Sequence, residues 1–202
     1  MNIQRYRTDE DVKIITSDPN DLYSYEVYVG RHVINVNPND SVWWVDADMV
    51  YCQRGGNVDS VDCAVVIRGY KPWFRASQIN PWSTLPYIDG CSTSQLIPPI
   101  RSGDPTWQLL YMHPNSSEQA HHIHSTARIV YVYKGSGVCH YGTKTDNKTM
   151  NLAEGDVLIL DKMLPHHFTT GEDKLIVLPL HVWSTTGREE FNHPMFNGTH
   201  EV

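Results

Sequence analysis

The chain has 202 residues, 40% of them hydrophobic, and a formal net charge of −7 at pH 7. This composition suits one domain with a sizeable core or two small ones, and the negative charge argues against nucleic acid or an anionic membrane as a partner. No apolar run approaches the roughly 20 residues that span a bilayer, and the polar N-terminal residues lack the apolar segment of a secretory signal. We therefore expect a cytoplasmic protein.

Strand signals dominate the chain, and helical signals are scarce. The predicted strands are short runs of β-branched and aromatic residues, bounded by glycine, proline, asparagine and aspartate. In chain order they cover residues 25–29, 32–35, 42–45, 61–67, 107–112, 128–133, 138–141, 156–160 and 174–182. The sequence therefore predicts an all-β fold.

Three local features refine this prediction. Glycines at 135 and 137 separate two of the predicted strands and can supply the positive φ of a hairpin turn. Residues 152–156 read as a turn that leads into a buried strand. Residues 69–105 are rich in proline, serine and glycine but also in aromatic residues, such as Trp73, Phe74 and Tyr87. A flexible linker seldom carries so many aromatics, so we expect an ordered irregular segment packed on the sheets and covering a barrel mouth. A linker between two small domains is the alternative.

The four cysteines are widely spaced and form no CxxC pair; they are Cys52, Cys63, Cys91 and Cys139. Zinc-ribbon and thioredoxin-like motifs are therefore not supported. In a cytoplasmic protein we expect reduced, buried thiols.

Two histidine clusters are the strongest chemical signal. His121, His122 and His124 form the first, and His166 and His167 follow Pro165 about forty residues later. Imidazole is the commonest protein ligand for transition metals. On an extended strand His122 and His124 point to one face, so a histidine from a neighbouring hairpin can close a three-histidine site. Because adjacent side chains point to opposite faces, one histidine of the His121–His122 pair and one of the His166–His167 pair should be bystanders.

The order of these features resembles the cupin superfamily. Across residues 107–183 the chain shows His-Xaa-His, a strand, Gly-Xaa-Gly, a loop, Gly-Asp, a strand and Pro-His. The matching residues are His122, His124 and Gly135 in the first family motif, and Gly155, Pro165 and His166 in the second. The resemblance implies a double-stranded β-helix, or jelly-roll, barrel over residues 101–202. Residues 1–100 would form a strand-rich N-terminal extension, and the protein would be a homodimer.

The chain also departs from the family pattern. Arg128 stands where the family has a glutamate ligand, and Asp161 and Met163 replace a proline and a glycine. Arginine stays protonated and cannot bind a metal, so the resemblance leaves a three-histidine site of His122, His124 and His166. If the strand is regular, Arg128 shares the face of the histidines and can pair with a substrate carboxylate. A bulge that turns it outward is the alternative.

Three other residues are candidates near this site. Glu118 precedes the first motif and could loop back to replace the missing carboxylate ligand. Tyr131, like Tyr111, Tyr133 and Tyr141, could line the barrel and donate a hydrogen bond to bound oxygen or substrate. His181 is a candidate proton shuttle, with a satisfied core histidine as the alternative.

A three-histidine site leaves coordination positions open for water, dioxygen or a chelating substrate. Among cupins such iron sites are associated with thiol dioxygenases and diketone-cleaving enzymes. The resemblance thus implies a mononuclear non-haem iron dioxygenase acting on a small carboxylate-bearing, anionic substrate. Fe(II) is the favoured metal, and zinc, nickel and manganese are possible. The alternatives are a redox-neutral lyase or isomerase and a non-catalytic ligand-binding barrel.

Overall fold

The computed structural model describes residues 2–16, 22–60, 62–81, 85–101, 103–119 and 121–183. These residues form strands and one turn of 3-10 helix at Ile88–Gly90, and none of their helices is long and apolar enough to cross a membrane. The strands are β1 (Ile3–Arg7), β2 (Val12–Thr16), β3 (Tyr25–Val29), β4 (His32–Asp46), β5 (Met49–Ser60), β6 (Cys63–Ile67), β7 (Arg75–Gln78), β8 (Leu85–Pro86), β9 (Ser92–Ile97), β10 (Thr106–Met112), β11 (Thr126–Thr143), β12 (Asp146–Ala153), β13 (Asp156–Leu160), β14 (His166–Thr169) and β15 (Leu175–Trp183). The all-β prediction is confirmed.

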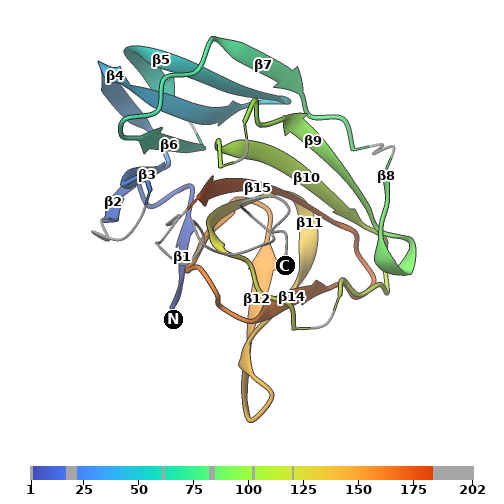
Figure 1. The fold of residues 1–202 in the computed structure, drawn as a ribbon. Coiled ribbons are helices and arrows are strands. Elements are labelled where there is room, and N and C mark those ends of the chain that lie inside the picture. Colours follow the sequence, from blue (N-terminus) through green and yellow to red (C-terminus); the bar gives the residue numbers. More distant parts are fainter. Residues whose placement is uncertain are drawn as a thin grey trace, which may run out of the picture.

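The described strands make two sheets (Figure 1). One has six strands in the order β2-β3-β6-β4-β5-β7, all from the N-terminal half. The other has nine strands, with the path β1-β13-β11-β15-β10-β9-β8 and with β12 and β14 paired to β11. Neighbouring strands in both sheets are antiparallel, as expected for strands joined by short turns.

Strand β11 organises the barrel because it pairs with four strands. Its first half, residues 126–135, lies between β13 and β15, and its second half, residues 136–143, lies between β12 and β14. One long strand thus passes through two sets of pairings, which curls the nine-stranded sheet around an interior. This is the double-stranded β-helix barrel that the sequence predicted.

The predicted hairpin at the glycines 135–137 is wrong, since β11 continues through them. Its register against β15 shifts between Val132 and Lys134, and Gly135 follows with a φ of +80°. A Cβ atom on Gly135 would lie 1.9 Å from the carbonyl oxygen of Lys174. The glycine therefore permits a bulge and a close backbone approach, and the chain reverses only after Thr143. The second predicted turn is confirmed, because Gly155 has a φ of +87° and leads into β13, which is buried throughout.

The two faces of β11 belong to different cores. Ala127, Ile129 and Tyr131 pack into the core that lies between the two sheets. Val130 and Val132 pack into the barrel interior. Because side chains alternate along a strand, even-numbered residues of this half of β11 face the barrel interior.

The N-terminal hundred residues do not form a separate unit. β1 pairs with β13, and β8 and β9 extend the barrel sheet beyond β10. The segment 69–105 is also more regular than predicted, since it contains β7, β8 and β9. Its aromatic residues lie in different environments: Tyr87 lines a barrel cavity, whereas Trp73 and Phe74 are 82% and 63% exposed.

The prediction for the cysteines is confirmed, because all four are buried and none forms a disulfide.

An ion cluster stabilises the six-stranded sheet. Arg68 bonds to Asp40 at 2.6 Å and to Glu26, and Glu26 also accepts hydrogen bonds from Tyr28 at 2.6 Å and Lys13 at 3.0 Å. Burial opposes ionisation of Glu26, but the bonds from Tyr28, Arg68 and Lys13 outweigh it and lower the pKa to about 2. The folded protein therefore holds this carboxylate ionised at a pH where the unfolded chain protonates it.

We expect the free energy of unfolding to fall as the pH drops from about 4.5 toward about 2. A carboxyl whose pKa is lower in the folded than in the unfolded protein stabilises the fold fully above its unfolded pKa. This stabilisation is lost as the pH falls through the folded pKa. We expect Glu26 to contribute roughly 2 kcal/mol to the free energy of unfolding, a value reduced for solvent screening because Arg68 and Lys13 are partly exposed. Urea unfolding between pH 2 and pH 6 measures it, with Glu26→Gln as the variant that lacks this component. An equal acid slope in both proteins would contradict the assignment.

Candidate metal centre

The structure brings His122, His124 and His166 together. One nitrogen from each ring lies within 4.8 Å of the other two, and the ring centroids of His122 and His124 are 4.6 Å apart. His166 begins β14, whereas the other two lie in the loop before β11. A pair of backbone hydrogen bonds between His122 and His166, at 3.0 and 3.2 Å, joins the two segments.

The local geometry differs from the regular strand assumed for residues 122 to 128, because β11 begins only at Thr126. His121 has a left-handed φ of +39°, which reverses the chain just before the site. Met163, at the place of the family's glycine, also keeps a left-handed φ of +60°, and its N–H donates to the carbonyl of His124 at 2.7 Å. Two strained residues and backbone bonds therefore place these histidines, rather than period-2 alternation.

The protonation of the rings suits metal binding at Nε2. The Nδ1 atom of His122 is 2.8 Å from the carbonyl of Gln119, and that of His166 is 2.7 Å from the carbonyl of Leu164. A carbonyl can only accept, so each Nδ1 carries the proton and each Nε2 has a lone pair. The Nε2 atoms of His122, His124 and His166 are buried and have no hydrogen-bond partner among the described residues. Three unsatisfied Nε2 atoms, two of them on rings whose Nδ1 is bonded to a carbonyl, fit a divalent metal ion.

Burial keeps these imidazoles neutral. Desolvation lowers the pKa of His166 to about 4 and, together with the charge of Arg128, that of His124 to about 2. The pKa of His122 is also lowered, mainly by burial. Neutral imidazole is the ligating form, so near neutral pH the site needs no proton release before it binds a cation.

Glu118 lies beside the three histidines. Its Oε2 atom accepts a hydrogen bond from the N–H of Phe168 at 3.1 Å, and its Oε1 atom lies 3.6 Å from Nε2 of His122. Burial raises the pKa of this carboxyl to about 7, against the opposing effects of the Phe168 N–H and Arg128. The carboxyl thus loops back toward the site, yet it is not one of the group of mutually close ligand atoms.

A barrel cavity of about 160 Å³ opens beside the site. Its wall is partly apolar, from residues such as Leu110, Val130 and Val177. The polar and charged residues that line it are Tyr87, Thr93, Gln108, Glu118, His122, His124 and Arg128. A small, partly open cavity with a few convergent polar groups is typical of a ligand site.

Arg128 points inward, as the alternation of β11 requires. It lines the cavity, and its Nε atom is buried with no hydrogen-bond partner in the part of the chain that the structure describes. Burial lowers its pKa to about 10, and the charges of Glu118 and Tyr87 oppose that effect. The guanidinium is therefore still cationic near neutral pH, and a buried cation of this kind calls for an anionic partner.

The assignment of Tyr131 to the cavity is wrong, because it lies on the odd-numbered face of β11 and packs in the core between the sheets. Tyr111 and Tyr133 pack against the same core, and Tyr141 packs against the barrel core. The tyrosine that does line the cavity is Tyr87. Sequence reasoning missed it because residues 69–105 show no strand periodicity that would assign a face.

His181 is buried next to the site, with its ring centroid 6.3 Å from that of His124. It is opposite Arg128 in the register of β15 against β11, and its Nε2 atom has no partner among the described residues. Burial lowers its pKa well below the usual value, with Arg128 adding to the effect. His181 is not part of the cavity wall, so it can act on the site only through its neighbours.

The bystander histidines form a second group apart from the three converging nitrogens. The Nδ1 atoms of His121 and His167 are 3.1 Å apart, and the ring of His140 stacks on that of His167 at 4.5 Å. Nδ1 of His167 also accepts a hydrogen bond from the N–H of His121 at 3.3 Å. The structure therefore separates His167 from His166, as the alternation of β14 predicts.

Taken together, the fold and site define a β-barrel protein with a buried three-histidine centre that fits a metal ion. Residues 108–183 match the family model described as a cupin domain, and this part of the chain belongs to the cupin superfamily. No curated protein matches the sequence significantly.

Solved structures share the fold at low identity. A putative glyoxylate-induced protein from Pseudomonas aeruginosa has a TM-score of 0.61 at 13% identity, covering 90% of this chain and 80% of its own. The protein Ylba from E. coli has a TM-score of 0.58 at 13% identity, with coverage of 89% and 90%. HEPD from Streptomyces albus, solved with 2-hydroxyethylphosphonate and Fe(II) bound, has a TM-score of 0.59 at 8% identity, with coverage of 96% and 80%. Because the matches cover most of this chain, the six-stranded sheet belongs to the shared architecture.

Proposed function

We propose that the protein is a mononuclear, metal-dependent enzyme that uses Fe(II) and dioxygen to oxidise a small carboxylate-bearing substrate. The observation that carries the proposal is the set of three buried Nε2 atoms, without partners among the described residues, beside a cavity that Arg128 also lines. The Fe(II) bound in the similar HEPD structure supports the choice of metal. When bound, the metal supplies a Lewis acid that activates dioxygen or polarises the substrate.

The chain's own residues bind and orient the substrate in this proposal. Arg128 pairs with the carboxylate through two parallel N–H donors, which fixes its direction as well as its position. The apolar side chains of Leu110, Val130 and Val177, which line the same cavity, exclude water from part of its wall. His181 acts as a positioning residue for His124, since its neutral ring lies next to the ring of His124 but does not line the cavity.

Oxygen uptake tests the proposed function. The protein is loaded with Fe(II) under nitrogen and then mixed with aerated buffer and a panel of short-chain carboxylates, with an oxygen electrode as the readout. We expect uptake that depends on a carboxylate and disappears in the His166→Ala variant. Full iron loading without carboxylate-dependent uptake for the whole panel would exclude the dioxygenase.

A redox-neutral lyase or isomerase is the second candidate. Glu118 favours it, because a cavity carboxyl with a pKa raised by burial to about 7 can exchange protons near neutral pH without an oxidant. Product formation by the metal-loaded protein under nitrogen separates this candidate from the first. If the protein binds metal but forms no product in air or under nitrogen, the third candidate, a non-catalytic ligand-binding barrel, is favoured.

We also propose that the protein is a homodimer. Trp73 and Phe74, which are 82% and 63% exposed, precede β7 at the edge of the six-stranded sheet, and exposed aromatics beside an edge strand favour pairing with a second copy. Sedimentation velocity measures the state, and a monomer at all concentrations would contradict this proposal.

A further inference from the structure

Two groups of opposite charge line the same cavity without meeting each other. Arg128 comes from β11, and Glu118 comes from the loop between β10 and β11. Oε1 of Glu118 lies 3.6 Å from Nε2 of His122, a ring that burial keeps neutral, and no ion pair joins Glu118 to Arg128 among the described residues. Nε of Arg128 has no hydrogen-bond partner among the residues that the structure describes. The cavity therefore presents a cation and a carboxyl at separate points on its wall.

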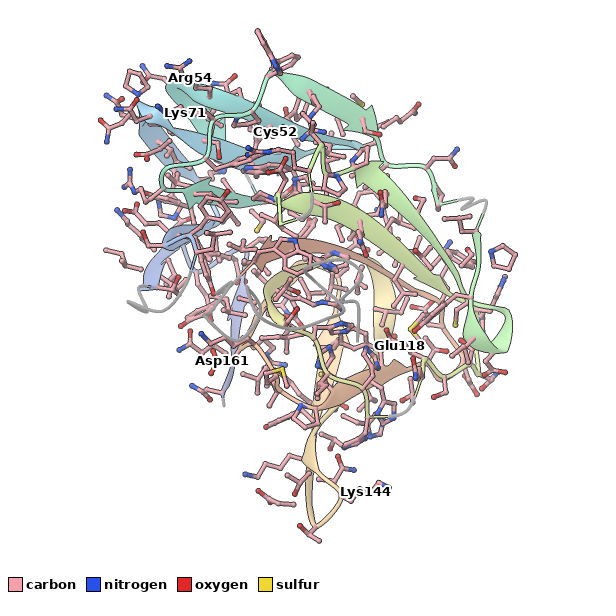
Figure 2. All side chains as sticks on the ribbon, in the orientation of Figure 1. Cys52, Arg54, Lys71, Glu118, Lys144 and Asp161 are labelled. Carbon is pink, nitrogen blue, oxygen red and sulfur yellow. The ribbon has the colours of Figure 1, made fainter. Side chains whose placement is uncertain are left out.

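Glu118 is held in place by β14. Its backbone N–H donates to the carbonyl of Phe168 at 3.0 Å, and its Oε2 atom accepts from the N–H of Phe168 at 3.1 Å. Only 7% of the residue is exposed. Two bonds to one strand residue fix both the loop and the carboxyl, so Glu118 is a preorganised acceptor rather than a loop side chain that happens to point inward. Figure 2 shows Glu118 at the β14 side of the barrel.

The space around these two groups suits a short bifunctional molecule. Apolar side chains, among them Leu110 and Val130, share the wall with Arg128 and Glu118. The cavity volume of about 160 Å³ is well above the roughly 10–15 Å³ that one water molecule needs. A hydrocarbon segment of a few carbons can pack against the apolar wall while its ends reach polar groups.

We propose that Glu118 is a specificity-determining residue, which selects short-chain carboxylates that also carry an amino group. The substrate carboxylate pairs with Arg128, and the ammonium group donates to Glu118. Each buried charge then has a partner of opposite sign, which offsets the cost of its desolvation. A dicarboxylate would place like charge against Glu118, and a simple fatty acid would leave it unpaired. The inference rests on the proposed function only for the carboxylate site at Arg128, and it needs no dioxygen chemistry.

Calorimetric titration of the full-length protein tests the selection. The probes are β-alanine, 3-hydroxypropionate, propionate and malonate, each titrated into zinc-loaded and metal-free protein. We expect β-alanine to bind at least about 10-fold more tightly than propionate, since a hydrogen bond to a charged group contributes about 1.5–3 kcal/mol. Malonate should bind most weakly. In Glu118→Gln the preference for β-alanine over propionate should fall to about one.

Matched variants separate this role from a structural one. Glu154→Gln removes an exposed carboxylate that pairs with Lys134 at 3.2 Å and should leave the preference unchanged. Glu118→Asp keeps the charge and should keep the preference at lower affinity, so it carries the test if the glutamine variant fails to fold by circular dichroism.

Three results would overturn the inference. These are equal binding of propionate and β-alanine by the unmodified protein, an unchanged preference in Glu118→Gln, and loss of zinc from Glu118→Gln, which would make Glu118 a metal ligand. Failure of the proposed function is seen separately, as absent metal binding or absent turnover, while the preference is still measured in metal-free protein.

Discussion

Replacing His166 with alanine is expected to lower the affinity for a divalent metal at least about 100-fold while the fold is kept. The variant removes one of the three converging Nε2 atoms, and loss of groups that merely orient metal ligands already costs about 10- to 100-fold. The metal-free protein should remain folded, because the lost ring carries a buried nitrogen with no partner among the described residues. Zinc titration against a competing chelator, with elemental analysis of the purified protein, measures the change.

The control for this variant is His113→Ala. His113 is exposed, lies outside the group of converging nitrogens and packs its ring against Tyr111 with the centroids 4.8 Å apart. Its replacement should leave the metal content unchanged. Equal zinc affinity in the His166 and His113 variants would show that the three histidines are not the metal site.

Replacing Arg128 with methionine is expected to weaken the binding of small carboxylates about 30- to 5,000-fold, while the metal content stays the same. Loss of one partner of a buried, hydrogen-bonded charge pair costs about 2–5 kcal/mol. The metal-free variant should unfold at the same temperature or higher, because methionine fills similar space without a buried guanidinium whose Nε atom has no hydrogen-bond partner among the described residues. Calorimetric titration with a short carboxylate and thermal unfolding in its absence give the two readouts.

Two further variants sharpen this test. Arg128→Lys keeps the charge but loses the planar pair of donors, so an intermediate affinity is expected. Arg54→Met removes an exposed arginine of the six-stranded sheet, away from Glu118 (Figure 2), and should change neither readout. A marked loss of thermal stability in Arg128→Met would instead assign the guanidinium a structural role.

The centre of the barrel was predictable because two physical signals agreed there. The His-Xaa-His and Pro-His spacing selected the residues that the structure brings together, and the turn at Gly155 leads into a buried strand as expected. The left-handed conformations of His121 and Met163, which position the histidines, leave no trace in side-chain periodicity.

The predictions that were wrong, or that missed a residue, also have physical causes. Period-2 alternation already places Arg128 and Tyr131 on opposite faces of a strand, so assigning both to one cavity conflicted with the rule used for the histidines. Glycine permits both turns and bulges, and the continuation of β11 through Gly135, together with the close approach of Lys174, shows that a bulge occurs. Tyr87 reaches the cavity through β8 and β9, whose pairing with β10 is a long-range property that local sequence does not encode.

Because side chains alternate along β11, this strand contacts the six-stranded sheet on one face and lines the cavity on the other. The site therefore depends on both halves of the chain. Ala127, Ile129 and Tyr131 rest on the six-stranded sheet, while Arg128, between them, faces the cavity. A fragment containing only residues 101–202 would expose that odd-numbered face to water, and it would also lack β1 and Tyr87. The match to the cupin domain begins at residue 108, but the smallest part of the chain able to hold Arg128 in place extends well upstream of that residue. Domain truncation guided by the family boundaries should therefore give an aggregating product rather than a smaller working protein.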